Sequence, residues 1–215
     1  MATHGHGDHW FTANVLAERF DAQVVASAGT IQQMHNTVSV RDVFWDKLWP
    51  GQIPAAPVTA VTVPDNRFSL EGHDLDNAVL HVPDLGLVVA GDAIYNGVHQ
   101  YLGESAHGGR DAWRKAVDTV KSLQPQWVVA SHKDKSRDDD AARVIAETRL
   151  YLDDADDFLA KYDKPEEFFF AMLKRWPDRH LGAAILWAGT DAIYASRGRE
   201  VSDVLADSLN GWFAP

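Results

Sequence analysis

The sequence predicts an α/β fold. Short apolar stretches with the length of buried strands alternate with longer stretches whose apolar residues recur at helical spacing. Metal-capable residues follow directly after two of the apolar stretches, 87–90 and 127–130. Because the carboxyl ends of core strands line the active crevice of α/β folds, the pattern predicts both the fold class and the edge where a site should lie.

The first part of the chain reads as short elements. Three helices are predicted, over Trp10–Phe20, Thr30–His35 and Val40–Leu48. Three strands are predicted, over Gln23–Ala26, Val58–Val63 and Phe68–Leu70. Two further apolar runs, Asn77–Val82 and Leu87–Ala90, should form a hairpin, because the turn-forming residues Pro83, Asp84 and Gly86 separate them.

The second part contains longer helices. An amphipathic helix is predicted over Arg110–Leu123, with one apolar face made of Trp113, Ala116, Val117, Val120 and Leu123. A buried strand, Trp127–Ala130, precedes a long acidic helix, Asp138–Tyr162. Another helix should start at Lys164, because proline and acidic residues favour a first turn. We therefore predict a core over residues 1–137 and a helical extension over 138–215, either packed on the core or acting as a lid.

Composition narrows the class of protein. The chain has 215 residues, a length typical of one domain with a sizeable core. The net charge of −11 argues against nucleic acid or an anionic membrane as a partner. There is no cysteine, so a metal site would be built from His, Asp and Glu. No apolar run has the length of a membrane span and the start lacks a signal-peptide pattern, so we expect a soluble, cytoplasmic protein.

The start of the chain holds a dense group of metal-capable side chains, in the run Thr3-His4-Gly5-His6-Gly7-Asp8-His9-Trp10. Imidazole and carboxylate groups are strong ligands for zinc and related metals, and the two glycines allow a tight turn. The alternative is a purification tag or a His-rich tail. A tag is a run of one residue type, without the interleaved aspartate and glycines, so we interpret the run as a metal site.

Asp92 and His132 follow the apolar runs 87–90 and 127–130. Taken alone, Asp92 could cap a helix or a turn, and His132 could be a surface histidine at a strand end. Together with the opening run they extend the predicted metal site. The sequence resembles the metallo-β-lactamase superfamily in the motif His4-x-His6-x-Asp8-His9, in Gly91-Asp92 and in His132, over about the first 135 residues.

The resemblance implies a metallo-β-lactamase-type αββα sandwich with two metal ions. His4 and His6 would bind the first metal with a third histidine. Asp8 and His9 would bind the second with His132, and Asp92 would bridge the two ions. In the interval where the family carries the third histidine, Gly72-His73 is the only Gly-His pair. His73 is therefore either that ligand or a hairpin-turn residue, in which case the ligand is absent from this sequence.

The family motif normally follows several strands, whereas three residues precede it here. The N-terminal half of the sandwich is thus incomplete in this sequence, and the exposed sheet face would be an association surface. We expect a second copy of the chain, another polypeptide or further N-terminal residues to cover it.

The implied function is metal-dependent hydrolysis by two zinc ions, with Fe or Mn also compatible with these ligands. A metal-bound hydroxide would attack an ester, lactone, thioester or amide carbonyl, while Asp8 and Asp92 act in catalysis. Tyr95, His99 and Tyr101 lie on the loop after Asp92 and could bind a small-molecule substrate, although polar residues are common on surface loops. The alternatives are a mononuclear iron dioxygenase of the same fold and a non-catalytic truncated homologue.

Overall fold

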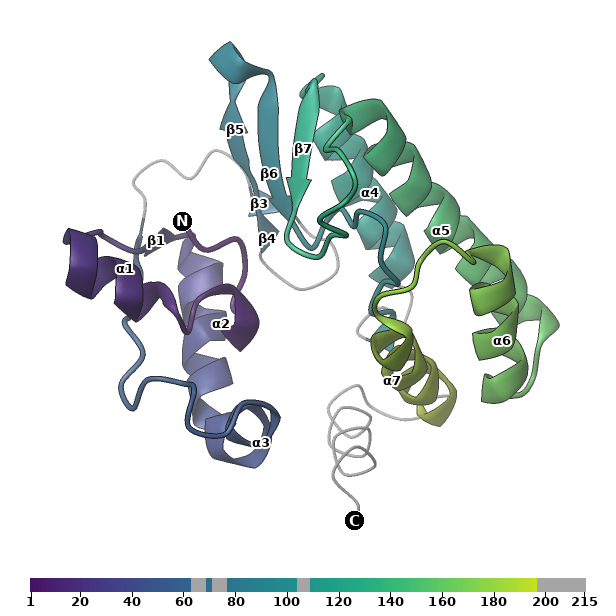
Figure 1. Ribbon diagram of the computed structural model, residues 1–215, viewed down its shortest axis with the longest axis horizontal. Coiled ribbons are helices and arrows are strands. Elements are labelled where there is room, and N and C mark those ends of the chain that lie inside the picture. The colour runs from purple at the N-terminus through teal and green to yellow at the C-terminus, as the bar shows by residue number, and fades with distance from the viewer. Residues whose placement is uncertain (63–68, 71–76, 104–108, 197–215) are drawn as a thin grey trace.

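The computed structural model describes residues 1–62, 69–70, 77–103 and 109–196. The helices are α1 (Ala13–Phe20), α2 (Ala28–Ser39), α3 (Asp46–Leu48), α4 (Gly109–Ser122), α5 (Ala141–Lys161), α6 (Pro165–Arg175) and α7 (Ala183–Ala195). The strands are β1 (Val25–Ala26), β2 (Val61–Thr62), β3 (Ser69–Leu70), β4 (Asn77–Ala78), β5 (Leu80–Val82), β6 (Leu87–Gly91) and β7 (Trp127–Ala130). The chain combines strands with helices, and the larger core has the alternating order β6-α4-β7-α5, so the predicted α/β class is confirmed (Figure 1).

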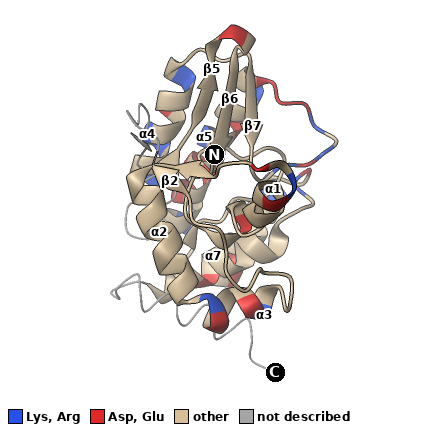
Figure 2. Cartoon of the chain, turned by 90° about the vertical axis from the view of Figure 1, so that its left-hand side faces the viewer, with Lys and Arg blue, Asp and Glu red and all other residues tan. Residues whose placement is uncertain are grey.

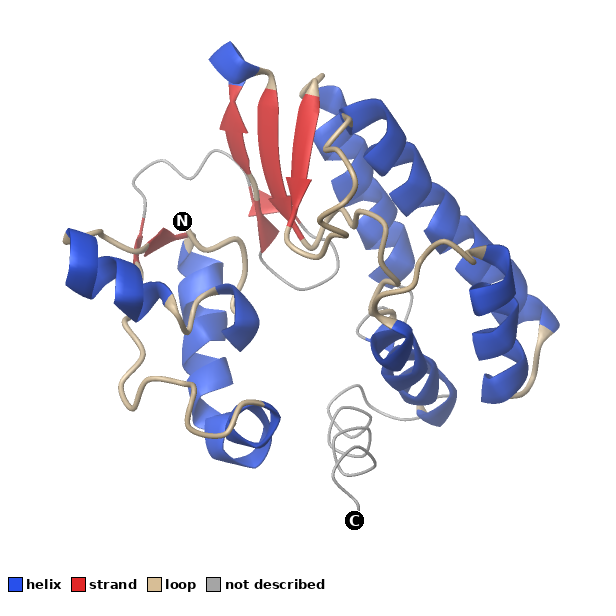
Figure 3. Ribbon diagram, in the orientation of Figure 1, coloured by secondary structure: helices blue, strands red, loops and turns tan. Residues whose placement is uncertain are grey.

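The three-stranded sheet β5-β6-β7 is the centre of the larger core. β5 pairs antiparallel with β6, as the predicted hairpin requires, and β6 pairs parallel with β7. Val88 and Val128 are paired in this register and are fully buried. The helices α4 to α7 gather on the side of the sheet away from the N-terminal elements (Figure 3). Their apolar faces, together with one face of the sheet, form a continuous hydrophobic cluster.

The predicted apolar face of α4 is confirmed. In α4, the side chains of Trp113, Ala116, Val117 and Val120 are all buried. In α6, Phe168 and Met172 are fully buried. Helix α7 lies outside the elements expected from the sequence. It carries apolar residues on nearly all sides, so the periodic contrast that marks an amphipathic helix is weak there.

The N-terminal residues join two small sheets. The backbone amide of Ala2 donates to the Val25 carbonyl of β1 (2.9 Å), and the Thr3 carbonyl accepts from the Ala78 amide of β4 (2.7 Å). Residues 2 and 3 therefore lie between β1 and β4. Ala2 also belongs to a second hydrophobic cluster, which contains Ala2, Trp10, Phe11, Ala26, Met34, Trp45, Ile53 and Ala60. This packing fixes the chain direction immediately before His4.

The predicted helix over Trp10–Phe20 begins later than expected. Gly7–His9 form a 3-10 turn, and α1 starts only at Ala13. Trp10 and Phe11 are 2% and 3% exposed, and the Trp10 indole nitrogen donates to the Gly5 carbonyl (3.0 Å). The two aromatic side chains thus anchor the turn before the helix can begin. By contrast, α2 starts earlier than predicted, because Ser27 caps it by accepting from the Thr30 amide.

The second face of the β5-β6-β7 sheet is apolar but only partly covered. The strand register places six residues on it, none of them buried: Leu80, Val82, Leu87, Val89, Trp127 and Val129. Trp127 is 49% exposed and Leu80 is 43% exposed. Figure 2 shows this face toward the viewer, with α5 behind it. That a second copy, another polypeptide or further residues cover this face stays a prediction, which light scattering and intact mass would test.

Among the described residues, no helix combines the length and apolar character that a membrane crossing requires. The expectation of a cytoplasmic location is a separate prediction.

We predict that Gly91→Ala lowers the free energy of unfolding more than Gly51→Ala does. Both glycines have positive φ (+55° and +70°), so alanine at either position costs about 1–2 kcal/mol of backbone strain. A Cβ atom at Gly91 would also lie 2.7 Å from the Thr3 hydroxyl oxygen, whereas nothing lies within 4 Å of one at Gly51. The additional overpacking should cost about 1–3 kcal/mol in urea unfolding. Equal losses in the two variants would show that Thr3 does not pack tightly against β6.

Candidate metal centre

Helix α2 and aromatic side chains hold the loop from His4 to His9 in place. The Gly5 carbonyl accepts hydrogen bonds from the Trp10 indole (3.0 Å) and from the Thr37 hydroxyl (2.7 Å). A Cβ atom at Gly5 would lie 2.5 Å from a Gln33 side-chain carbon. Glycine is therefore required at this close approach, and the loop can turn its imidazoles toward one point.

Asp92 enters the same region from the end of β6. A register shift between Val89 and Gly91, together with the positive φ of Gly91, directs the chain at this point. The Asp92 side chain is 2% exposed. Its Oδ2 atom lies 3.2 Å from His132 Nε2 and 3.8 Å from His4 Nε2. Its Oδ1 atom lies 3.5 Å from His9 Nε2.

The remaining members of the opening motif complete the cluster. Asp8 Oδ2 lies 3.3 Å from His9 Nε2 and 3.7 Å from His132 Nε2. His6 Nδ1 lies 3.2 Å from His4 Nε2. Two groups have ligand atoms within 4.8 Å of one another: His4, His9 and Asp92, and Asp8, His9 and His132. The structure thus brings together six of the seven residues predicted as ligands. Their division between two metals stays a prediction.

The two carboxylates are held in the ionised form. Burial alone would raise the pKa of Asp92, but the hydrogen bond from His132 and the nearby His9 and His4 imidazoles hold that pKa well below its usual range. Burial opposes the charge on Asp8 as well, and its contact with His9 lowers the pKa of Asp8. Burial would lower the pKa of His132, but Asp92 raises it. The cluster therefore concentrates negative charge among imidazole groups.

This arrangement fits a metal ion. The described residues leave His9 Nε2 buried without a hydrogen-bond partner, although it lies between two carboxylate oxygens. A buried polar atom in that state is expected to meet a group outside the protein. Imidazole nitrogens and carboxylate oxygens without sulfur suit zinc, iron and manganese. We therefore regard His4, His6, Asp8, His9, Asp92 and His132 as the candidate metal centre.

The other predicted site residues lie in different surroundings. His73 is outside the described residues. Tyr95 is 2% exposed, and its hydroxyl donates to Asp92 Oδ2 (3.2 Å). His99 is also buried, with Nδ1 2.9 Å from the Tyr151 hydroxyl. Burial, with help from Arg179, lowers the pKa of His99 to about 4, so its imidazole is neutral near pH 7.

Tyr101 is half-buried. The substrate-binding role of these three residues stays a prediction.

Sequence reasoning missed three residues that support the centre. The Asn96 amide donates to the His132 carbonyl (3.1 Å), and the Asn96 carbonyl accepts from the Asp134 amide (2.8 Å), which joins the loops carrying Asp92 and His132. Thr148 on α5 binds the backbone of Tyr95. The centroid of the Trp45 ring lies 6.3 Å from the centroid of the His6 ring. Of these three, Thr148 lies at helical spacing from the buried apolar residues of α5, a pattern that could have marked it as inward-facing but indicates no partner.

Comparisons with known proteins agree with this geometry. Residues 1–132 match the sequence profile of the metallo-beta-lactamase superfamily. No curated protein matches the chain. Many solved structures do, and those described next are 16% to 19% identical to this chain.

The metallo-beta-lactamase family protein TTHA1429 from Thermus thermophilus is 16% identical, with a TM-score of 0.56; the match covers 91% of this chain and 73% of that one. A beta-lactamase domain protein from Burkholderia ambifaria is 16% identical, with a TM-score of 0.61, over 90% of this chain and 66% of that one. TTHA1623, solved in a di-iron-bound form, is 19% identical, with a TM-score of 0.50, over 69% and 74%.

The profile match covers more than half of the chain and contains every residue of the candidate metal centre. The structural neighbours share the fold and match most of the described chain. The chain therefore belongs to the metallo-beta-lactamase superfamily.

Proposed function

We propose that this protein is a metal-dependent hydrolase with a binuclear centre, in which zinc is the principal metal. The observation that carries the proposal is the convergence of His4, His6, His9 and His132 with two ionised carboxylates in one partly buried cluster. Two ions bound there would supply a hydroxide near neutral pH and polarise a substrate carbonyl. The substrates would be small molecules with an ester, lactone, thioester or amide bond.

The two carboxylates of the centre have different surroundings and should have different roles. Asp92 is 2% exposed and its two oxygens contact three imidazoles, so its role would be to position these histidines. Asp8 is 29% exposed and lies at the edge of the same cluster. Its position nearer to solvent would place this carboxylate beside a bound substrate, where it would assist the departure of the leaving group.

Iron is the main alternative to zinc. A structural neighbour was solved in a di-iron form, and the ligand types suit either metal. Elemental analysis of the purified protein separates the cases. Two zinc ions per chain support the hydrolase as proposed, whereas a single iron would favour an iron dioxygenase of the same fold.

We predict that His6→Ala and His9→Ala each lower the metal content per chain and reduce turnover by orders of magnitude. Each substitution removes an imidazole nitrogen from the cluster, so a metal would lose one of its ligands. Metal content is measured by elemental analysis, and turnover on a panel of chromogenic esters and lactones. His35→Ala is the matched control, because His35 is exposed on α2 and should leave both quantities unchanged. Unchanged metal content in both His6→Ala and His9→Ala would refute the site.

A second prediction concerns Asp92→Ala, which should be as severe as either histidine variant. Asp92 contacts imidazoles from both the opening loop and the end of β7, so its loss should weaken binding of both metals. Titration of the metal-free variant with zinc measures this. Full binding of two ions at wild-type affinity would contradict a bridging position.

His73 gives a third prediction. If it is the third ligand of the first metal, His73→Ala should lose one metal per chain. If it is a turn residue, the variant should keep its metals and change stability by roughly 0.5 kcal/mol or less. Elemental analysis combined with thermal unfolding separates the two outcomes.

A further inference from the structure

Tyr95 contacts two predicted metal ligands that come from different strands. Its hydroxyl donates to Asp92 Oδ2 at 3.2 Å, and the same oxygen lies 3.2 Å from His132 Nε2. Its ring is stacked on the His132 ring, with centroids 5.3 Å apart and planes 22° apart. The Tyr95 side chain thus contacts both the carboxylate that follows β6 and the imidazole that follows β7.

The side chain of Tyr95 is itself held in place by the helices behind the sheet. The fully buried hydroxyl of Thr148 accepts from the Tyr95 amide (3.2 Å) and donates to the Tyr95 carbonyl (3.1 Å). Trp113 of α4 packs against the Tyr95 ring at a centroid distance of 5.7 Å, and its indole donates to the Ala93 carbonyl (2.9 Å). Two helices therefore fix both the backbone and the ring of Tyr95.

We propose that Tyr95 is a positioning residue for the metal centre, acting through Asp92 and His132. A hydrogen bond to an ionised carboxylate is stronger than one between neutral groups, so it restricts the rotation of the Asp92 side chain. The stacked ring restricts the rotation of the His132 imidazole. With both ligands held before the metal arrives, less conformational freedom is lost on binding.

This role differs from the substrate contact predicted from the sequence. The Tyr95 side chain is 2% exposed, and its hydroxyl is directed at Asp92 rather than at solvent. A residue that contacts substrate should affect KM, whereas one that orients ligands should affect metal affinity first. Partners that orient metal ligands typically contribute 10- to 100-fold to metal affinity.

The inference rests on the proposed metal centre and is tested with Tyr95→Phe, which keeps the stacked ring and removes only the hydroxyl. The metal-free protein is titrated with zinc against a chromogenic chelator, and the cobalt-loaded protein is examined by visible absorption. We expect a 10- to 100-fold loss of affinity at one site or both, with a changed cobalt spectrum. Urea unfolding of the metal-free form checks that the loss does not come from unfolding.

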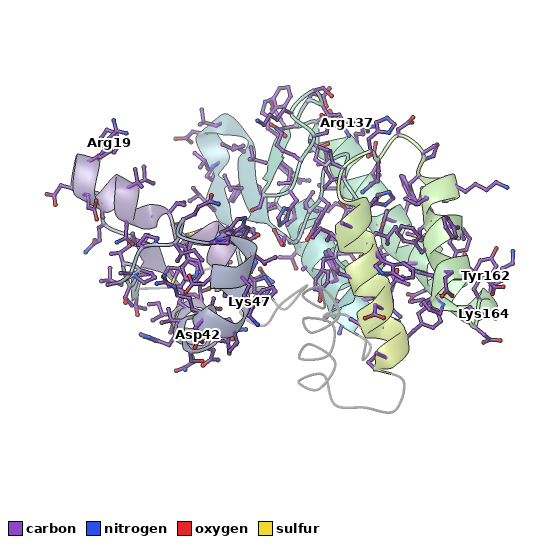
Figure 4. All side chains as sticks on the ribbon, turned by 60° about the horizontal axis from the view of Figure 1, so that its bottom comes forward. Arg19, Asp42, Lys47, Arg137, Tyr162 and Lys164 are labelled. Atoms are coloured by element: carbon purple, nitrogen blue, oxygen red, sulfur yellow. The ribbon has the colours of Figure 1, made fainter. Side chains whose placement is uncertain are left out.

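Tyr194→Phe is the matched control. Its hydroxyl also donates one hydrogen bond, to the Tyr162 carbonyl (2.6 Å). Figure 4 places Tyr162 at the end of the molecule opposite the N-terminal elements. This variant should bind metal as the wild type does, whatever stability it loses in the metal-free form.

Thr148→Val provides a second route to the same test if Tyr95→Phe folds poorly. Valine keeps the shape of threonine but cannot bind the Tyr95 backbone, so metal affinity should fall, and Thr148→Ser should restore it. Wild-type metal affinity in folded Tyr95→Phe overturns the positioning role, as does a raised KM at unchanged affinity. If the wild-type protein itself binds no metal, the proposed function fails and this inference fails with it.

Discussion

The structure depends on one buried carboxylate. Asp92 is 2% exposed, and burial of a charge is costly unless charged or polar groups compensate it. The compensation comes from His4 and His9 of the opening loop, from His132 after β7 and from the Tyr95 hydroxyl. The N-terminal elements and the β5-β6-β7 core therefore meet at Asp92. The same convergence creates a group of ligands suited to a metal ion, so one constraint accounts for both the packing and the candidate chemistry.

The backbone contacts around Asp92 explain how the imidazoles and the Tyr95 hydroxyl are held next to this carboxylate. Insertion of residues 2 and 3 between β1 and β4 sets the direction of the chain at His4. On the opposite side, Asn96 links the loop after β6 to the loop after β7, and Thr148 fixes Tyr95 from α5. Helix α5, which belongs to the predicted C-terminal extension, thus supports the centre as well as covering the sheet. Whether residues 138–215 form a separate unit stays a prediction.

Much of the fold and most of the candidate centre could be predicted from local sequence patterns. The opening motif identified four residues of the centre, and the positions after β6 and β7 identified Asp92 and His132. What could not be predicted depends on contacts between distant residues. Thr148 has no motif of its own, because its role comes from facing Tyr95 across the core. Helix α7 lacks periodic contrast. The later start of α1 follows from burial of Trp10 and Phe11 in a cluster that no local pattern reveals.

The most direct test of the account is anomalous diffraction from crystals of the metal-loaded protein, recorded at the zinc and iron absorption edges. We predict two peaks at the candidate metal centre, each at about 2.0–2.2 Å from imidazole nitrogens or carboxylate oxygens. Asp92 should contact both ions, His4 and His6 should bind one, and Asp8, His9 and His132 should bind the other. A map with no peak in this cluster, or with its peaks among other residues, would contradict the central claim.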